Sequence, residues 1–474
     1  MANQTEPQAT RSILPADMIS VEDARARILE RFAPTPAEPT PLLDALGLVL
    51  AEDVRAPFDI PPLANTGMDG YAVRHRDTEG ATYETPKTLE VIGYLPAGSV
   101  YDGAVAEGQA VRIMTGAPIP AGADAVVPFE ETDEYDRLAP SPPRGEGGGE
   151  GSRSGSHTTW QDNPRTEVRI DVAAAEGANI RPAGEDVRTG ELVLPRGTVI
   201  GPAQVGVLAS LGLDRVAVHR RPVVAILSTG DELLRPGEPP APGKIYDANA
   251  FGLAAAVTAL GATPLVLDVA RDTVEALTAR IREGLATADL LITSAGVSRG
   301  DFDVVKTVLA AEGEIGFWTV RMKPGKPLAF GTLRGDDGRE VPHLGLPGNP
   351  VSAMMTFELF GRAAIFKMLG KLEADPGAWQ RPTVRAIALD RVANTDGRRF
   401  YARCIATQTP EGNWQVSLTG PQGSGVLTSM SLANAYAICP EDTPAIEVGE
   451  TCEVMLVDRE APIPTRTPSE PKDH

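Results

Sequence analysis

Continuous apolar runs of strand length alternate with stretches of helix length in the middle of the chain. The run Val223–Ser228 is typical of a strand buried on both faces. A helix is expected over 247–260, ending at Gly261, where glycine can take the left-handed conformation of a helix cap. The same alternation predicts strands at 264–269, 290–294 and 341–346, helices at 273–285, 304–311 and 351–369, and strand or hairpin segments at 315–333. This order predicts a parallel sheet with helices on both faces.

The pattern differs on either side of this segment. Ser20 and Asp23 resemble a capping box, which predicts a helix over 20–33, and a second short helix is expected over 41–50. Residues 51–127 form short runs broken by glycine and proline, which favour irregular β structure. Further β segments are expected at 166–172 and 191–199, a helix at 202–211, and turn-separated β segments at 383–392, 399–407, 414–419 and 452–457. The last group predicts a small β-barrel or sandwich.

The length of 474 residues suggests about three domains. We predict a multidomain α/β protein with a central parallel-sheet α/β domain, irregular mainly-β N-terminal domains and a small C-terminal β-barrel. Its expected parts are a flexible N-terminus at 1–17, an N-terminal region at 18–218, the α/β domain at 219–372, the barrel at 378–460 and a flexible tail at 461–474. Within the N-terminal region, a disordered insertion is expected at about 134–165, because 139–156 is mostly Gly, Ser and Pro.

Charge and composition exclude several classes of function. The formal net charge is −20, and a field of that sign repels nucleic acids and anionic lipid surfaces. The three cysteines form no CxxC pair and the five histidines no HExxH motif, which argues against a disulfide framework or a zinc site. The chain begins without an apolar signal segment and contains no apolar run near 18 residues, so we expect a cytoplasmic protein that does not span a membrane.

The chemistry is expected in the loops that follow the strands of the α/β segment. In open parallel sheets, ligands bind outside the carboxyl ends of the strands. Small residues at 295–300 would let backbone N–H groups approach an anion, and the helix after Pro350 begins with the Ser352 hydroxyl nearby. Three carboxylates, Glu232, Asp272 and Asp303, would repel a phosphate there unless a hard cation such as Mg²⁺ lay between them.

Each of these features also has a simpler explanation. Asp272 begins a capping box, Asp303 precedes a helix that it could cap, and Gly-rich loops are common. Lys323 and Lys326, in the Pro-containing turn KPGKP, could be solvated charges. The functional interpretation is favoured because all these residues fall on one edge of one predicted sheet.

Two strings in the N-terminal half remain open to both interpretations. Residues 65–74 present Asp69 and residues 112–124 present Thr115, in turn-rich sequence. From the residues alone, structural turns are the favoured explanation.

At these residues the sequence resembles the MoeA family of molybdopterin molybdenumtransferases and the related C-terminal domain of gephyrin. The matching motifs are MDGYAVR at 68–74, RIMTGAPIPAGADAVV at 112–127, GEDV at 184–187, STGDEL at 228–233, IYDAN at 245–249, GVSRGDFD at 296–303, KPGKP at 323–327 and GLPGNPVS at 345–352. The resemblance runs from about residue 18 to 458 and is interrupted mainly at 134–165.

The resemblance implies the last step of molybdenum cofactor synthesis, in which molybdate is inserted into adenylylated molybdopterin and AMP is released with the help of Mg²⁺. It also implies a homodimer of four-domain subunits with an intersubunit active site, a central domain like that of MogA, and contacts with molybdopterin adenylyltransferase and with chaperones of molybdoenzymes.

By motif, the resemblance also implies the site residues. The catalytic set is Asp69, Thr115, Asp186, Glu232, Asp272, Asp303 and Lys323, of which Glu232, Asp272 and Asp303 would hold the metal. The substrate-binding set is Ser228, Thr229, Gly230, Ser294, Gly296, Ser298, Gly300, Arg321, Lys326, Pro347, Asn349 and Ser352. We expect Lys323 and Arg321 to attract molybdate or phosphate, and the 294–300 loop to cradle the terminal phosphate of the pterin.

Four positions, in three places, depart from the usual family pattern. Ala295 replaces the first glycine of a Gly-Gly pair, so a positive φ there would cost about 1 kcal/mol or more. Thr66-Gly67 replaces Ser-Ala, and Thr319 stands where some relatives have a lysine. These changes concern substrate binding more than the class of reaction.

Three other functions are compatible with parts of the chain. A molybdopterin adenylyltransferase shares the α/β domain but usually consists of it alone. A gephyrin-like interaction scaffold would have a vestigial site, against which the retained Asp69, Glu232, Asp272 and Asp303 argue. A nucleotide hydrolase of the competence-damage type would lack the MDGYAVR and MTGAP strings.

Overall fold

The computed structural model describes residues 18–138, 165–295 and 304–457. Backbone contacts divide the chain into two units, which we describe separately. The main unit comprises Met1–Glu52, Arg196–Val205 and Asp214–His474, and the N-terminal unit comprises Asp53–Pro195 and Gly206–Leu213. Helix α3 (Pro202–Ser210) has residues in both units.

The N-terminal unit is built on a five-stranded sheet of order β7-β4-β6-β5-β8. Its strands are β4 (Gly70–Val73), β5 (Lys87–Leu95), β6 (Gln109–Ile113), β7 (Ala125–Pro128) and β8 (Glu167–Ile170). Shorter elements are β2 (Val54–Arg55) with β10 (Leu192–Leu194), β3 (Asn65–Thr66) with β9 (Ile180–Arg181), the 3-10 turns η1 (His75–Thr78) and η2 (Phe129–Glu131), and α2 (Asp133–Leu138). The irregular, mainly-β structure predicted for this region is confirmed.

Two of the sequence motifs lie on adjacent strands of this sheet. The MDGYAVR motif contains β4, and the RIMTGAP motif begins with the last two residues of β6. The two strands are antiparallel, with Tyr71 opposite Arg112. Both side chains are buried and meet the carboxylate of Glu134: the Tyr71 hydroxyl donates to Oε2 at 2.7 Å, and Arg112 Nε lies 2.9 Å from the same oxygen. Removing one partner of such a buried charge pair strongly destabilises the folded protein, because the other charge is left buried and unpaired. Tyr71 and Arg112 therefore have a structural role in their motifs.

The main unit contains a six-stranded sheet of order β15-β12-β16-β20-β19-β17. Its strands are β12 (Val223–Ser228), β15 (Thr263–Val266), β16 (Leu290–Ser294), β17 (Gly313–Thr319), β19 (Pro327–Arg334) and β20 (Glu340–Leu346). The four strands from β15 to β20 are parallel, as predicted, whereas β19 and β17 are antiparallel to their neighbours. The sheet is mixed because short connections join β17, β19 and β20 directly, with no crossover helix between them.

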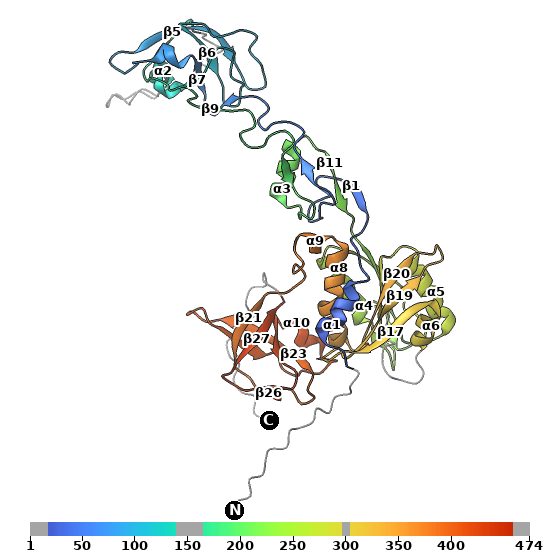
Figure 1. The fold of residues 1–474 in the computed structure, drawn as a ribbon. Coiled ribbons are helices and arrows are strands. Elements are labelled where there is room, and N and C mark those ends of the chain that lie inside the picture. Colours follow the sequence, from blue (N-terminus) through green and yellow to red (C-terminus); the bar gives the residue numbers. More distant parts are fainter. Residues whose placement is uncertain (1–17, 139–164, 296–303, 458–474) are drawn as a thin grey trace, which may run out of the picture. The chain divides into compact units, whose positions relative to one another are not determined.

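Helices cover both faces of the parallel part (Figure 1). On one face, α1 (Val21–Leu29), α4 (Ala248–Ala259), α7 (Pro350–Thr356) and α8 (Arg362–Met368) contribute to one hydrophobic core. On the other face, α5 (Val274–Leu285) and α6 (Val304–Glu312) contribute to a second. The buried strand residues point alternately into these two cores, as in Val224 and Ile226 against Ala225 and Leu227.

Three predicted helices differ from the observed structure. Ser20 caps α1 by accepting from the Asp23 N–H at 3.0 Å, but α1 ends at Leu29. The predicted helix at 351–369 is divided into α7 and α8 by a π-helical turn, η4 (Phe357–Gly361). The helix predicted at 41–50 is wrong: residues 42–47 form turns, and Val49 and Leu50 form bridges with Val199 and Val218. Gly47 N–H bonds the distant Ile200 O at 2.8 Å.

The predicted C-terminal β-barrel is confirmed. Five strands close on themselves in the order β23-β24-β21-β27-β25, with β25 pairing back to β23. They are β21 (Thr383–Ala388), β23 (Arg399–Gln408), β24 (Trp414–Leu418), β25 (Ala435–Cys439) and β27 (Thr451–Leu456). The short strand β18 (Met322–Lys323), which precedes β19 in the chain, adds to β23 from outside, so the α/β sheet and the barrel are joined at this point.

The remaining elements of the main unit are short. They are the pairs β1 (Ala37–Pro41) with β11 (Arg215–His219), β13 (Leu233–Leu234) with β14 (Ile245–Tyr246) and β22 (Val392–Ala393) with β26 (Ala445–Ile446), and the helices α9 (Lys371–Ala374) and α10 (Leu427–Ser431).

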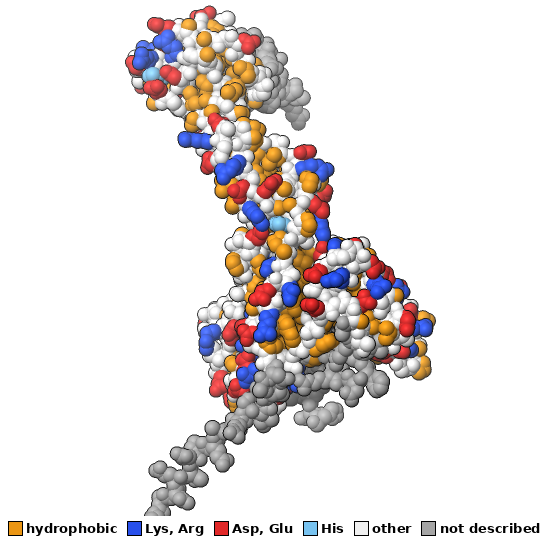
Figure 2. Space-filling model, turned by 45° about the vertical axis from the view of Figure 1, so that its right-hand side comes forward, with side chains coloured by type: hydrophobic (Ala, Val, Ile, Leu, Met, Phe, Trp, Pro, Cys, Tyr) orange, Lys and Arg blue, Asp and Glu red, His pale blue; other side chains and the backbone are white. Residues whose placement is uncertain are grey.

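Acidic and basic side chains are interspersed on the face shown in Figure 2, so the net charge of −20 is not gathered in one patch there. Across the described residues, every helix is too short or too polar to cross a bilayer. The predicted flexible termini, most of the 134–165 insertion and the GVSRGDFD motif lie outside the described residues.

Candidate functional site

The carboxyl ends of three central strands of the α/β sheet are in register. Ser228 at the end of β12 pairs with Ser294 at the end of β16, and Ser294 pairs with Leu346 at the end of β20. The loop after β15 joins them, since Thr229 forms a bridge with Ala270. We call this region the carboxyl edge. Among the described residues, it brings together the predicted substrate-binding residues Ser228, Thr229, Gly230 and Ser294, all of which are buried.

Asn249, in the first turn of α4, links two of these loops. Its Nδ2 donates to Ser294 Oγ at 2.7 Å and to Gly348 O at 2.7 Å. Its Oδ1 is buried and has no partner among the described residues, as is also true of Ser228 Oγ. Unpaired buried polar atoms are uncommon in proteins, and these two lie where ligands bind in open α/β sheets.

Backbone strain is present beside these groups. Ala295, immediately after Ser294, has a φ of 94°, which confirms that this position requires a positive φ. An L-residue in this conformation costs about 1 kcal/mol or more, and such residues cluster at functional sites. The Ala295 N–H is held by Leu346 O at 3.1 Å, so the strain is imposed by the pairing of β16 with the end of β20.

Glu232 and Asp272 lie in neighbouring loops of the carboxyl edge. Gly230 has a φ of 144°, and a Cβ there would lie 2.4 Å from Glu232 Oε2, so the carboxylate of Glu232 lies directly over Gly230. Gly230 N–H bonds Ala270 O at 3.4 Å, two residues before Asp272. The residue that caps α5 is Thr273, whose hydroxyl accepts from the Ala276 N–H, and not Asp272. The capping explanation for Asp272 is therefore wrong.

The third predicted metal ligand lies outside the described residues. Asp303 belongs to the segment 296–303, as do Gly296, Ser298 and Gly300. Within the described ranges, no three His, Cys, Asp or Glu side chains are grouped as metal ligands. The three-carboxylate metal site therefore stays a prediction, of which the structure describes two members.

A hollow of about 600 Å³ lies where the KPGKP turn meets the barrel. Lys323 and Lys326 line it together with the buried Ser352 of α7. Gly325, at the apex of the turn, has a φ of 101°, and a Cβ there would lie 2.5 Å from Thr356 Oγ1. Only glycine fits this position, and it lets the turn pack closely on α7.

The barrel supplies two further cations to this hollow, and sequence reasoning missed both. Arg391 and Arg398 line it, and Gln422 and Ser424 add polar groups. We call this hollow the cation pocket and define it by Lys323, Lys326, Arg391 and Arg398. None of its described lining residues is acidic. Four cations around one hollow give a local positive potential in a chain of strongly negative net charge.

Asp396 places a carboxylate beside two cations of the pocket. Its Oδ2 lies 3.7 Å from Lys323 Nζ and accepts a short hydrogen bond from Arg398 Nη2. Burial raises the pKa of Asp396, but the hydrogen bond and charge of Arg398 and the charge of Lys323 lower it further, and the net pKa is below the usual 3.8. Asp396 is therefore ionised at neutral pH and neutralises part of the charge of the pocket.

Three other predicted residues have different surroundings. Arg321 does not line the cation pocket: its Nη2 donates to Asp442 and, at 3.3 Å, to Gly397 O. Pro347 is buried in the loop after β20. Asn349 begins α7 with its backbone carbonyl, which accepts from Ala353 N–H at 2.9 Å, while its side chain makes no cap bond.

In the N-terminal unit, the structure brings Asp69 and Thr115 together. Both the N–H and the hydroxyl of Thr115 donate to Asp69 Oδ1, at 2.7 and 2.6 Å. Burial raises the pKa of Asp69 and the two Thr115 bonds lower it, with a net pKa below the usual 3.8. Asp186 is exposed in the GEDV turn, where its N–H donates to Ile60 O at 3.0 Å.

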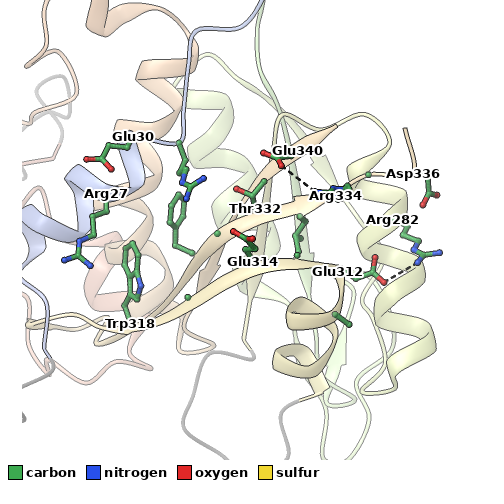
Figure 3. Close-up of a pocket in the computed structure, with 18 residues that line it drawn as sticks. Arg27, Glu30, Arg282, Glu312, Glu314, Trp318, Thr332, Arg334, Asp336 and Glu340 are labelled. Atoms are coloured by element: carbon green, nitrogen blue, oxygen red, sulfur yellow. Dashed lines mark hydrogen bonds and ion pairs between the residues drawn. The ribbon is translucent and has the colours of Figure 1, made fainter. Parts of the chain in front are cut away.

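Another hollow, of about 800 Å³, contains none of the predicted site residues. Figure 3 shows it along β17 and β19, with Trp318 and Phe330 contributing aromatic rings. Arg27 of α1 and Glu30, the residue after this helix, lie at one end, and the Arg282–Glu312 pair lies at the other. Its rim carries both signs of charge, so it lacks the single-sign character of the cation pocket.

Comparison with known proteins agrees with these features. A family model described as the MoeA N-terminal region (domain I and II) matches residues 19–212. A model of a probable molybdopterin binding domain matches 225–367, which contains the carboxyl edge and the KPGKP turn. A model of the MoeA C-terminal region (domain IV) matches 385–457, which supplies Arg391 and Arg398.

Individual relatives match over nearly their whole length. Molybdopterin molybdenumtransferase 2 of Mycobacterium tuberculosis is 36% identical over 443 residues, which are 92% of this chain and 99% of that protein. The molybdopterin molybdenumtransferase of Haemophilus influenzae is 33% identical over 439 residues, covering 92% and 98%. The crystal structure of a molybdopterin biosynthesis MoeA protein from Pyrococcus horikoshii is 29% identical, covers 93% of this chain and 99% of that one, and superposes with a TM-score of 0.73. The chain therefore belongs to the MoeA family.

Proposed function

We propose that this chain is a molybdopterin molybdenumtransferase, which inserts molybdate into adenylylated molybdopterin and releases AMP. The names of its relatives support this function, and so does the chemistry of the main unit. The reaction requires two anion sites, one for a small doubly charged oxyanion and one for a phosphorylated organic molecule.

The observation that carries the proposal is the cation pocket. Two lysines of one turn and two arginines of the barrel surround about 600 Å³ whose described lining contains no acidic residue. Cationic side chains with flanking hydroxyl and amide groups, here Ser352, Ser424 and Gln422, are the donors that a tetrahedral oxyanion requires. We therefore place molybdate in this pocket.

The carboxyl edge is the proposed site of the phosphorylated substrate. Pro347, Gly348 and Asn349 lead from the end of β20 directly into α7, whose Ser352 lines the cation pocket. One short segment thus connects the two sites. The chain's contribution to the reaction is to hold the pterin phosphate at this edge beside the bound molybdate, since positioning of two reactants alone can supply a large part of a rate enhancement.

Glu232 and Asp272 fit the Mg²⁺ that the family resemblance implies. Carboxylate oxygens are the protein ligands that Mg²⁺ prefers, and both side chains are exposed on adjacent loops of the carboxyl edge. Mg²⁺ bound there would neutralise negative charge on the pyrophosphate group. The carboxylate of Glu232 lies over Gly230, where a residue with a side chain would displace it.

We extend the proposal, on the resemblance, to a homodimer that acts in the cytoplasm. Analytical ultracentrifugation of the full chain tests the oligomeric state, with sedimentation as a single 49.9 kDa species as the result against it.

Two conversions with purified protein test the proposed function. In the first, adenylylated molybdopterin is incubated with molybdate and Mg²⁺, and AMP is measured. In the second, molybdopterin is incubated with ATP and Mg²⁺, and the adenylate is measured. The proposal predicts molybdate-dependent AMP release in the first and no product in the second. The opposite pattern would make the chain an adenylyltransferase, and no product in either would support a scaffold.

A further inference from the structure

Asp396 is an acidic group held at an anion pocket. The side chain is 31% exposed and its Oδ2 faces two of the four cations that define the cation pocket, Lys323 at 3.7 Å and Arg398 in a hydrogen bond. A carboxylate in this place competes with any anion that enters, because both require the same positive groups.

The loop that carries Asp396 is fixed from several directions. Asn394 Nδ2 donates to Arg398 O at 2.8 Å and closes the loop, and Asn394 N–H bonds Pro444 O at 2.8 Å. Arg321 Nη2 donates to Gly397 O at 3.3 Å. Arg398 itself is anchored by a bond from Nη1 to Met322 O at 3.2 Å. The carboxylate therefore keeps its place without help from a ligand.

Two other carboxylates near the cation pocket pair with cations other than Lys323 and Arg398, one of them with Arg391 of the pocket itself. Glu447 binds Arg391 Nε at 2.9 and 3.1 Å, and Asp442 binds Arg321, which does not line the pocket. Lys326 makes no ion pair with any described residue. Asp396 is thus the carboxylate whose charge bears most directly on Lys323 and Arg398.

We propose that Asp396 is an internal counter-ion of the cation pocket, which an incoming molybdate displaces from Lys323 and which sets the affinity of the chain for oxyanions. In the empty pocket it keeps Lys323 and Arg398 in place. In the filled pocket it repels the dianion and so weakens binding, which allows molybdate to leave the pocket for the pterin. The inference rests on the proposed function only in the choice of molybdate as the ion.

The test is the affinity of the full chain for sodium molybdate, measured by equilibrium dialysis. Asp396→Asn keeps an oxygen that accepts from Arg398 but removes the charge, and we expect its Kd to fall by about tenfold or more, given an effective dielectric constant near 20 at such sites. Asp442→Asn is the matched control, because it removes one charge from a neighbouring loop, and it should leave Kd unchanged. Lys326→Gln should raise Kd.

A gain in affinity is a result that mere structural damage does not produce. An unchanged or raised Kd in Asp396→Asn would overturn the inference, as would an equal fall in Asp442→Asn. AMP release is measured in parallel and tests the proposed function separately: tighter molybdate binding in a chain without AMP release would uphold the counter-ion and refute the enzyme.

Discussion

Thr115 donates two hydrogen bonds to a single oxygen of Asp69, from its N–H at 2.7 Å and from its hydroxyl at 2.6 Å. The residues are 46 positions apart in the chain, and the pairing of β4 with β6 brings their motifs together. The family resemblance implies that both residues take part in the reaction. The geometry shows that Thr115 acts on the Asp69 carboxylate, which it holds in the ionised form.

Removal of the hydroxyl should weaken this hold. In Thr115→Val the N–H bond remains, and we expect the pKa of Asp69 to rise toward 3.8 and kcat/KM to fall about tenfold, the usual effect of one charge-assisted hydrogen bond. A lowered folded-state pKa stabilises the fold above pH 4, and this contribution is lost as pH falls through the folded pKa. The variant should therefore lose less stability between pH 5 and pH 2.5, measured by urea unfolding. Thr115→Ser is the control and should behave as wild type.

Glu232 should be required for the chemical step. Glu232→Gln preserves the shape of the side chain over Gly230 but removes the charge, and we expect single-turnover AMP release to slow about 100-fold or more. The adjacent Asp231, whose side chain is exposed, provides the control variant Asp231→Asn, for which we expect wild-type rates. Unchanged AMP release in Glu232→Gln would refute a role for this carboxylate in holding Mg²⁺.

Asn249 should act by positioning the loops of the carboxyl edge. In Asn249→Ala, Ser294 Oγ and Gly348 O lose their shared donor, and we expect a lower kcat with a smaller change in KM for the adenylylated pterin, and protection from hydrogen exchange to fall at 346–349. Asn249→Asp would place a carboxylate against Gly348 O and should be more harmful than alanine. Equal losses in kcat/KM and in thermal stability for both variants would indicate a purely structural role.

His343 should make the fold sensitive to acid. It is fully buried in β20 with Nε2 3.0 Å from Thr293 Oγ1, and burial lowers its pKa from 6.5 to about 3. The unfolded chain therefore binds a proton that the folded chain excludes, so stability is complete above pH 6.5 and is lost as pH falls toward 3. From pH 7 to pH 5 this loss is about 2 kcal/mol. The free energy of unfolding in urea, measured at pH 7 and at pH 5, should fall less in His343→Gln than in wild type, by about that amount. An equal fall in the variant and in wild type would show that burial of His343 does not cause the acid sensitivity.

Much of the main unit could be predicted from local patterns. The bounds of β12 and β16 agree with their apolar runs, because strands buried on both faces must be apolar at every position. The loops of the carboxyl edge follow from this, since parallel strands place their carboxyl ends together. The strained φ of Ala295 was also anticipated, because the position is normally a glycine.

Features that depend on distant contacts were not predictable. The cation pocket exists because β18 pairs with β23, which places Met322 opposite Arg399 and brings the barrel's arginines to the KPGKP turn, and no local pattern encodes that pairing. The helix expected at 41–50 fails for the same reason: a helix-like bond from Ala45 N–H to Pro41 O is not continued, because Leu42 and Gly47 bond the distant Asp214 and Ile200. A turn signal at 395–397, followed by two arginines, was the one local sign of Asp396 and Arg398.

In the proposed reaction this chain couples the release of AMP to the insertion of molybdenum, and the stoichiometry of a single turnover measures that coupling. Purified chain is mixed with limiting adenylylated molybdopterin, isotopically labelled molybdate and Mg²⁺, and AMP and pterin-bound molybdenum are measured in the same sample. We predict one molybdenum bound per AMP released, and neither product without molybdate. AMP released at the same rate in the absence of molybdate, or without molybdenum in the pterin, would show that the two events are not coupled.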